Sequence, residues 1–402
     1  MTKVKKIFTD HPLLIIVILF ACVSCFAIMN AAPLITKVAS PYTLWTKQLF
    51  FYILSAVIVF IIYYIGNDSV YDHIELIYYI CLFLLFLLAF DHILCKRILG
   101  WTNRNLIPFA HSAGGATSWF NLPGFSLQPS EFMKIIIVIY LAKITKEYND
   151  EILIRTFQSE INYLLKVLKI IVPPILLILL QNDTGVVLII LVGIFFVVFS
   201  SGLRKEWFLF IFGIVALIIG IGTYLFLFQH DIFTKILPSH QIARLYGWID
   251  PEGTIGKEGF QLFYSLLSYG SAGLFGHGFQ AVVKNFPEAQ TDFIFAVITT
   301  DYGFIGGFVT IALIVIFDVI ILRIGLKSTN DRDKYFTMGI FGLLFFQQVW
   351  NIGMILGLLP ITGITLPFIS YGGSSLLSYM LTIGMFLDIE HQNNIVKNKQ
   401  KI

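Results

Sequence analysis

Charged residues are scarce in this chain: Asp, Glu, Lys and Arg make up 13% of its 402 residues, whereas hydrophobic residues make up 57%. A typical soluble domain is roughly 25% charged, so the composition excludes an ordinary soluble globular domain. The net charge is only +3, which provides no strongly basic surface for nucleic acid. Together these deficits indicate an integral membrane protein.

Cysteines and nucleotide-binding motifs are also few. Of the four cysteines, Cys22 and Cys25 form a CxxC inside an apolar run, a position that favours helix packing over redox or metal chemistry. Of the other two, Cys81 lies within a different apolar run, near residues 74–94, and Cys95 lies at its end. No Walker sequence occurs, which argues against nucleotide use. No tandem repeat or low-complexity tract occurs either, so we expect a single membrane domain over residues 1–402.

Apolar runs long enough to cross a bilayer, which takes about 20 residues, occur about ten times. They lie near residues 13–31, 46–65, 74–94, 131–146, 162–180, 184–201, 207–228, 290–323, 335–357 and 366–388. The first run follows Lys3, Lys5 and Lys6 as in a signal peptide, but no small-residue cleavage site follows it, so we interpret it as a retained span. The predicted fold class is an all-α integral membrane protein with about ten transmembrane helices.

An even number of spans places both termini on one side of the membrane, and an excess of Lys and Arg marks the cytoplasmic side. With the N-terminus in the cytoplasm, the cytoplasmic segments hold Lys3, Lys5, Lys6, Lys143, Lys146, Arg155, Arg204, Lys205, Arg323, Lys327, Arg332, Lys334, Lys397, Lys399 and Lys401. Lys96, Arg97 and Arg104 fall outside, against this trend. The sequence therefore predicts that both termini are cytoplasmic. Two long segments, about 95–130 and 229–289, would then be extracytoplasmic, and long loops of this kind are often functional.

The stretch SLQPSEFMK, residues 126–134, places an acid and a base at the start of the fourth span. Ser130 is a candidate N-cap, with the helix beginning at Glu131. Glu131 and Lys134 are three residues apart and share one helix face. One interpretation is an interfacial ion pair whose Lys extends outward. The other is a polar site that lines a cavity, because ionisable groups within spans usually mark function.

The stretch NFPEAQTDFIFAVITTDYGF, residues 285–304, places carboxylates at the mouth of the eighth span. Pro287 suits a first helical turn, which would put Glu288 and Asp292 on one face of that helix. Asp301 would lie roughly 180° around it, unless the helix breaks at Gly303 or earlier. Desolvation would raise the pKa of Asp292 toward the range of a general base. The alternative is a structural cap or an ion-pair partner.

Three further outer segments carry unusual chemistry. HQIARLYGWIDPEG, residues 240–253, supplies Arg244 and Asp250. Glycines at 270, 273, 276 and 278 prevent a continuous helix there, and they either bring backbone close to a ligand or serve as connectors. GLLPITGITLPFISYGGSS, residues 357–375, is either a broken segment that closes a site or a simple short loop, because irregular backbone at membrane depth needs protein or a water-filled cavity around it.

The family resemblance is carried by six stretches, in order: GATSWF…GFSLQPSEFMK (115–134), QNDTG (181–185), ARLYGWIDP (243–251), FYSLLSYGSAGLFGHG (263–278), PEAQTDFIFA (287–296) and GLLPITGITLPFISYGGSS (357–375). In this order they resemble the SEDS family of bacterial cell-wall proteins, FtsW, RodA and SpoVE. GATSWF looks closer to RodA-type members than to the division-specific type. The resemblance implies ten spans in the bacterial cytoplasmic membrane.

The resemblance also implies an activity, that of a peptidoglycan glycosyltransferase that joins the disaccharide-peptide units of lipid II and releases undecaprenyl diphosphate. The family's catalytic aspartate falls on Asp292. Expected substrate-binding residues are Glu131, Lys134, Arg244, Glu288 and Ser370. The leaving diphosphate needs charge stabilisation, for which Lys134, Arg244, the start of the eighth span or a divalent cation (Mg or Mn) are candidates. The implied protein partner is a class B penicillin-binding protein, a transpeptidase.

Departures from the family pattern and two competing functions remain. Many relatives have His at Gln290, Pro-Asp at Asn182-Asp183 and a Glu pair at Thr300-Asp301, which puts a role for Gln290 or Asp301 in doubt.

A lipid II flippase would also be a bundle with buried ionisable groups, but it should carry them through the membrane depth. Asp318, near the inner end of the eighth span, is the exception to outer clustering and is expected in a structural ion pair. The third candidate is a non-catalytic scaffold for the transpeptidase.

Overall fold

The computed structural model describes residues 12–35, 40–100, 105–113, 116–152, 154–236, 239–257 and 259–399. Several residues used in the sequence predictions lie outside this part of the chain: Lys3, Lys5, Lys6, Arg104, Gly115 and Lys401.

Ten long helices occur in the described chain, as the apolar runs predict. They are α2 (Pro12–Ala31), α3 (Leu44–Ile65), α5 (Ile74–His92), α6 (Pro129–Glu151), α7 (Phe157–Leu180), α8 (Thr184–Ser200), α9 (Lys205–Phe228), α13 (Ile294–Leu326), α14 (Asp331–Ile355) and α15 (Gly373–Lys399). Within the described residues, seven of them are long and apolar enough to cross a membrane by length and composition. The predicted class, an all-α membrane protein, is confirmed.

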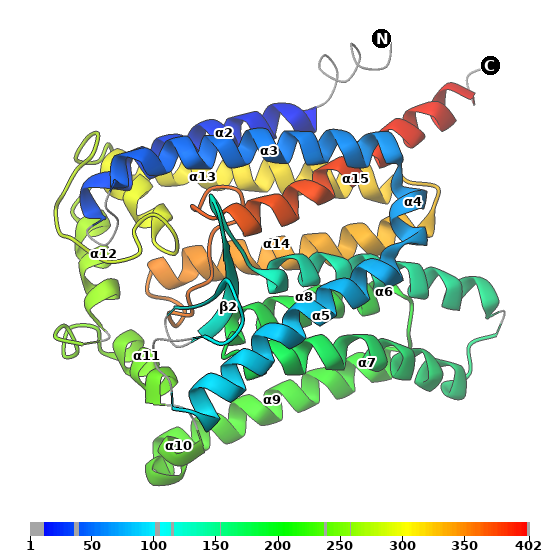
Figure 1. The fold of residues 1–402 in the computed structure, drawn as a ribbon, viewed down its shortest axis with the longest axis horizontal. Helices are drawn as coiled ribbons and strands as arrows, with labels where there is room; N and C mark the ends of the chain where they lie inside the picture. The colour runs from blue at the N-terminus through cyan, green and yellow to red at the C-terminus, as the bar shows by residue number, and fades with distance from the viewer. Residues whose placement is uncertain are drawn as a thin grey trace.

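The long helices lie side by side, and α2 begins at the same end of the bundle at which α15 ends (Figure 1). Helix α14 packs against α6, α8 and α13, while α15 packs against α3. Close packing in the centre depends on small residues. A Cβ atom on Gly193 of α8 would lie 2.5 Å from the Leu343 side chain of α14, and one on Gly339 would lie 2.5 Å from Val138 of α6. By contrast, α9 contributes no buried residue.

The first long loop contains a small antiparallel sheet, which the sequence did not predict. Its strands are β1 (Ala110–Ala113), β2 (Ala116–Leu122) and β3 (Phe125–Leu127), in the order β1-β2-β3. Phe120 of β2 pairs with Leu127 of β3, and α6 starts directly after this hairpin. The second long loop contains α10 (His230–Ile236), α11 (Ser239–Ile249) and α12 (Phe260–Gly270). The remaining short elements are α4 (Asn67–Asp72), η1 (Ala32–Leu34), η2 (Pro41–Thr43) and a π-helix, η3 (Ile93–Ile98).

Helix α13 breaks at Gly303, whose φ of 60° and ψ of −154° are non-helical. The glycine-rich segment after α12 fills this break: the backbone N–H groups of His277 and Gly278 donate to the carbonyls of Thr300 and Asp301 at 2.9 and 3.0 Å. A Cβ atom on Gly276 would lie only 2.2 Å from the Asp301 carbonyl oxygen, so this approach requires glycine. Gly276 therefore lets the segment approach the backbone of α13 closely.

The segment between α14 and α15, residues 356–372, is irregular, as both interpretations of residues 357–375 expected. Side chains from the surrounding helices satisfy its carbonyl groups. The Ser24 hydroxyl donates to the Ile369 carbonyl at 2.8 Å, and the Asn351 amide donates to the Ile364 carbonyl at 2.7 Å. Irregular backbone can lie at this depth because protein groups replace the missing water.

Candidate active site

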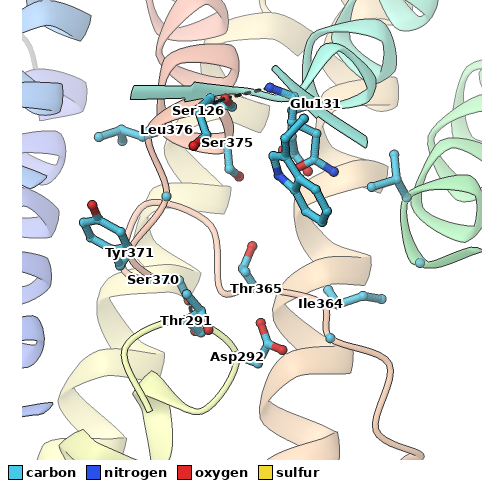
Figure 2. Close-up of a pocket in the computed structure, with 18 of the residues that line it drawn as sticks. Ser126, Glu131, Thr291, Asp292, Ile364, Thr365, Ser370, Tyr371, Ser375 and Leu376 are labelled. Carbon is cyan, nitrogen blue, oxygen red and sulfur yellow. Dashed lines mark hydrogen bonds between the residues drawn. The ribbon is translucent and has the colours of Figure 1, made fainter. Parts of the chain in front are cut away.

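A cavity of about 890 Å³ lies toward the end of the bundle where α2 ends and α3 begins. The β2–β3 hairpin, the first residues of α3, α6, α8 and α15, and the irregular segment before α15 form its walls. Five of the six predicted site residues line it: Glu131, Arg244, Glu288, Asp292 and Ser370. Figure 2 shows Asp292, Thr291 and Ser370 at one end of the cavity and Glu131 and Ser126 at the other.

Asp292 lies in the turns before α13, not within a helix. The predicted helical start at Pro287 is wrong, because α13 begins at Ile294 and Glu288 has a positive φ of 58°. The carboxylate of Asp292 is half-buried and faces the cavity. Burial and then the nearby charge of Glu288 raise the pKa of Asp292 to about 7, whereas Arg244 and Thr291 act to lower it. A carboxyl group with this pKa is suited to exchange a proton near neutral pH.

The backbone around Asp292 is held by three hydrogen bonds. The Asn351 side chain donates to the carbonyl of Asp292 at 2.8 Å, and the buried Ser370 hydroxyl donates to the carbonyl of Thr291 at 2.7 Å. The backbone N–H of Tyr371 donates to the carbonyl of Gln290 at 2.9 Å. Ser370 also accepts from the N–H of Leu366 at 2.8 Å. Ser370 therefore positions the aspartate through the backbone.

Arg244 comes from α11 and reaches the same end of the cavity. Its guanidinium donates to the Thr362 carbonyl at 3.2 Å, and the side chain is otherwise exposed. The adjacent Gly363 lies against the Asp292 carboxylate, since a Cβ atom there would be 3.4 Å from it. Arg244 thus places a positive charge at the end of the cavity that contains Asp292. Lys47 of α3, which the sequence analysis did not single out, is an exposed lysine on the cavity wall.

Glu131 and Lys134 form a buried ion pair of 2.6 Å. The predicted N-cap at Ser130 is wrong: α6 begins at Pro129, after Gln128. Lys134 is fully buried and does not extend outward; it also donates to Gln347 at 3.3 Å and lies 4.2 Å from the centre of the Tyr379 ring. Glu131 contacts the cavity, whereas Lys134 lies behind it. A lysine buried this way needs such partners to remain charged.

Asp183 is a further cavity residue to which the sequence analysis assigned no role. It is the N-cap of α8, where its carboxylate accepts from the N–H of Val186 at 3.4 Å, and it accepts from the Gln128 side chain at 3.0 Å. Burial raises the pKa of Asp183 to about 6. The signal in the sequence was its place directly before the sixth apolar run, which is typical of an N-cap. Its bond to Gln128 had no such signal, because 55 residues separate the two.

Asp301 and Asp318 are among the buried aspartates that lie away from this cavity. Asp301 accepts from the backbone N–H of Ala281 at 3.2 Å, within the segment that fills the break in α13. Asp318 accepts from the Gln348 side chain at 3.2 Å. Since that partner is a neutral amide, the ion pair predicted for Asp318 is not found among the described residues.

The described residues contain no group of three or more His, Cys, Asp or Glu side chains arranged to hold a metal ion. Magnesium bound together with a phosphate ligand usually needs only one or two carboxylates from the protein. Glu288 and Asp292 are an acidic pair that could provide them at the end of the cavity that contains Arg244, because both line the cavity and their charges interact.

Comparison with known proteins places the chain in a family. The FtsW/RodA/SpoVE family model, described as a cell cycle protein, matches residues 10–395. Stage V sporulation protein E of Bacillus subtilis is 30% identical over 394 residues, which cover 96% of this chain and 98% of that protein. The probable peptidoglycan glycosyltransferase FtsW of Coxiella burnetii is 34% identical over 287 residues, which cover 70% of this chain and 73% of that protein.

Solved structures share the fold. One, described as the structural coordination of polymerization and crosslinking by a peptidoglycan synthase complex, has a TM-score of 0.72 at 24% identity and covers 95% of this chain and 97% of the other. The rod shape determining protein RodA of Thermus thermophilus has a TM-score of 0.64 at 24% identity and covers 96% of this chain and 98% of the other. The chain therefore belongs to the FtsW/RodA/SpoVE family, the SEDS family that its motifs resemble.

Proposed function

We propose that this protein is a peptidoglycan glycosyltransferase that polymerises lipid II at the outer face of the bacterial cytoplasmic membrane, with Asp292 as the general base. Several relatives, among them those of Coxiella burnetii and Bacillus subtilis, are named as probable peptidoglycan glycosyltransferases. The observation that carries the proposal is the environment of Asp292: a braced carboxyl group with a pKa of about 7 that faces a large polar cavity beside Arg244.

The reaction needs one proton transfer and one displacement. A sugar hydroxyl attacks the anomeric carbon that bears the diphosphate, and Asp292 accepts the hydroxyl proton as the new C–O bond forms. The bond from the anomeric carbon to the diphosphate oxygen breaks, and its electron pair leaves with undecaprenyl diphosphate. A single displacement inverts the anomeric centre.

The leaving diphosphate carries negative charge and needs stabilisation rather than a proton. Arg244 and Lys47 are the cationic side chains that line the described cavity. Lys134 lies behind Glu131 and is neutralised by it, so its proposed role is to hold Glu131 in place. If a divalent cation takes part, Glu288 and Asp292 would hold it, and it would supply further charge neutralisation of the diphosphate.

The orientation in the membrane follows from the basic residues. Lys143, Lys146, Arg204, Lys205 and Arg323 lie at the ends of helices on the side of the bundle where α2 begins. The positive-inside rule makes this side cytoplasmic, so both termini are cytoplasmic and the cavity is near the outer surface. The partner that we propose is a class B penicillin-binding protein, in keeping with the fold shared with a subunit of a peptidoglycan synthase complex.

A lipid II flippase is the competing function. It needs a polar path through the membrane, whereas the acidic side chains that line the described cavity, Glu131, Asp183, Glu288 and Asp292, all lie near the starts of α6, α8 and α13. Asp318, deeper in the bundle, faces Gln348 and does not line the cavity. This arrangement favours chemistry at the membrane surface.

The test is reconstitution of the purified protein, with and without its transpeptidase, in vesicles that contain fluorescent lipid II. Gel separation follows the glycan polymer, and chemical quenching of outer-leaflet fluorescence follows movement between leaflets. We expect polymer. Movement of lipid II between leaflets without polymer, with or without the transpeptidase and divalent cations, would replace the enzyme by a flippase.

A further inference from the structure

The cavity has a second end, away from Asp292, that the reaction described above does not use. Its lining there includes Trp119 and Asn121 of β2, Gln128 and Asp183. Trp119 and Asn121 are two residues apart on one strand, so their side chains point to the same face of the sheet. The pairing of Phe120 with Leu127 places Gln128 opposite Trp119 across the hairpin. The Gln128 amide in turn donates to Asp183 at 3.0 Å.

The hairpin that carries this end of the cavity is anchored to the bundle. The backbone N–H of Gln128 donates to the Ser374 hydroxyl at 3.0 Å, and this hydroxyl donates to the Ser126 carbonyl. Asn121 accepts from the Ser126 hydroxyl at 2.8 Å. These bonds connect the hairpin to the first turn of α15, so the half-buried Trp119 ring is presented by a braced backbone.

The electrostatics of the two ends differ. At the end of the cavity that contains Asp292, the charges of Glu288, Asp292 and Arg244 influence one another, and the Arg244 side chain is exposed. At the other end Asp183 is influenced by Glu131 and by Lys134, which is fully buried and already paired. A diphosphate would meet two carboxylates here and no accessible cation from these residues. An uncharged ligand rich in hydroxyl groups avoids this repulsion.

We propose that Trp119, Asn121, Gln128 and Asp183 form a subsite for uncharged pyranose rings of the glycan strand. The apolar face of a sugar ring packs on the indole, which combines a large apolar surface with a polar edge. The carboxylate accepts hydrogen bonds from ring hydroxyls, and the amide groups of Asn121 and Gln128 can donate to and accept from ring hydroxyls and N-acetyl groups. This proposal rests on the proposed glycosyltransferase function, because a polymerase must hold a sugar chain as well as a lipid diphosphate.

The test measures binding of chitotetraose, an uncharged N-acetylglucosamine oligomer without lipid or diphosphate, to the full-length protein in nanodiscs. The variants are Trp119→Leu, Trp119→Phe and Asp183→Asn. The control is Trp207→Phe, at the opposite end of the bundle, where Trp207 stacks on Phe157. We expect Trp119→Leu to weaken binding about fivefold to tenfold. Trp119→Phe should retain most of the affinity because it keeps a flat ring, Asp183→Asn should weaken binding, and Trp207→Phe should bind like wild type.

Three results would overturn the subsite: wild type that does not bind the oligosaccharide, Trp119→Leu that melts like wild type and binds it equally well, or inorganic diphosphate that displaces it. Thermal unfolding of each variant is measured alongside, and Asp183→Asn, which should still weaken binding, decides the matter if Trp119→Leu does not fold. Asp292→Asn should bind the oligosaccharide normally. Failure of the wild type to polymerise lipid II while binding still depends on Trp119 would refute the glycosyltransferase and leave the sugar subsite standing.

Discussion

Asp292 should destabilise the folded protein at neutral and alkaline pH, and Asp292→Asn should remove this penalty. The pKa of Asp292 is raised from 3.8 to about 7 in the folded state. The folded protein therefore keeps a proton that the unfolded chain releases. Below about pH 4 the carboxyl group is protonated in both states and imposes no penalty on the folded protein. The penalty grows as the pH rises from about 4 to about 7.

The magnitude follows from the shift. About three pKa units at 1.36 kcal/mol each correspond to about 4 kcal/mol above pH 7, and to about 2 kcal/mol at pH 5.5, where the shift is only partly expressed. Packing differences between Asp and Asn are the same at both pH values. The gain in unfolding free energy from Asp292→Asn should therefore be about 2 kcal/mol larger at pH 8 than at pH 5.5.

The assay is thermal unfolding of wild type and variant in the same detergent at pH 5.5 and pH 8. We expect Asp292→Asn to raise the Tm at pH 8 by a few degrees more than at pH 5.5. The control is Asp231→Asn, which removes an exposed carboxylate on α10 and should show no such difference. An equal gain at both pH values, or a gain that is larger at pH 5.5, would refute a raised pKa for the carboxyl group of Asp292.

Three further predictions follow from the same contacts. Lys134→Met leaves Glu131 buried without its partner and should destabilise the protein by about 3–5 kcal/mol in thermal unfolding, with partial recovery when Glu131→Gln is added; an unchanged Tm would contradict the buried pair. Ser370→Ala leaves the Leu366 N–H without its acceptor and should cost about 1–3 kcal/mol, and it should lower kcat for lipid II polymerisation more than it changes KM. Normal kcat would show that Ser370 does not position Asp292. The polymerisation rate should rise with pH through an apparent pKa of about 7, because only the ionised Asp292 accepts a proton; a rate that falls over this range would contradict its role as base.

The sequence predicted the spans and some local contacts well for physical reasons. A bilayer requires long apolar helices, so ten apolar runs corresponded to ten helices. Glu131 and Lys134 pair within one helix turn, a local relation that spacing reveals. The prolines and glycines before α15 also indicated the irregular segment, because both residue types disfavour a continuous helix.

Other features depended on distant contacts. Pro287 suited a helix start, but Ser370 and Asn351 hold residues 291 and 292 in turns from elsewhere in the chain. The Lys134 side chain is long enough to extend outward, and the sequence left this possibility open. Gln347, which is 213 residues away, instead provides an acceptor inside the bundle. Glycine spacing before α13 could not show that the partner of Gly276 is the backbone of Asp301. Partners of this kind are set by tertiary packing, and no local pattern records them.

The measurement that tests the central claim most directly is the initial rate of lipid II polymerisation by Asp292→Asn and by Asp318→Asn, each reconstituted with its transpeptidase. The two changes remove one carboxylate each, and the Asn of Asp318→Asn can still accept the bond from Gln348. Loss of a general base should slow Asp292→Asn by about 10²–10⁴-fold, whereas Asp318→Asn should retain a rate close to wild type. A folded Asp292→Asn that polymerises at the wild-type rate would contradict the assignment of Asp292 as the base.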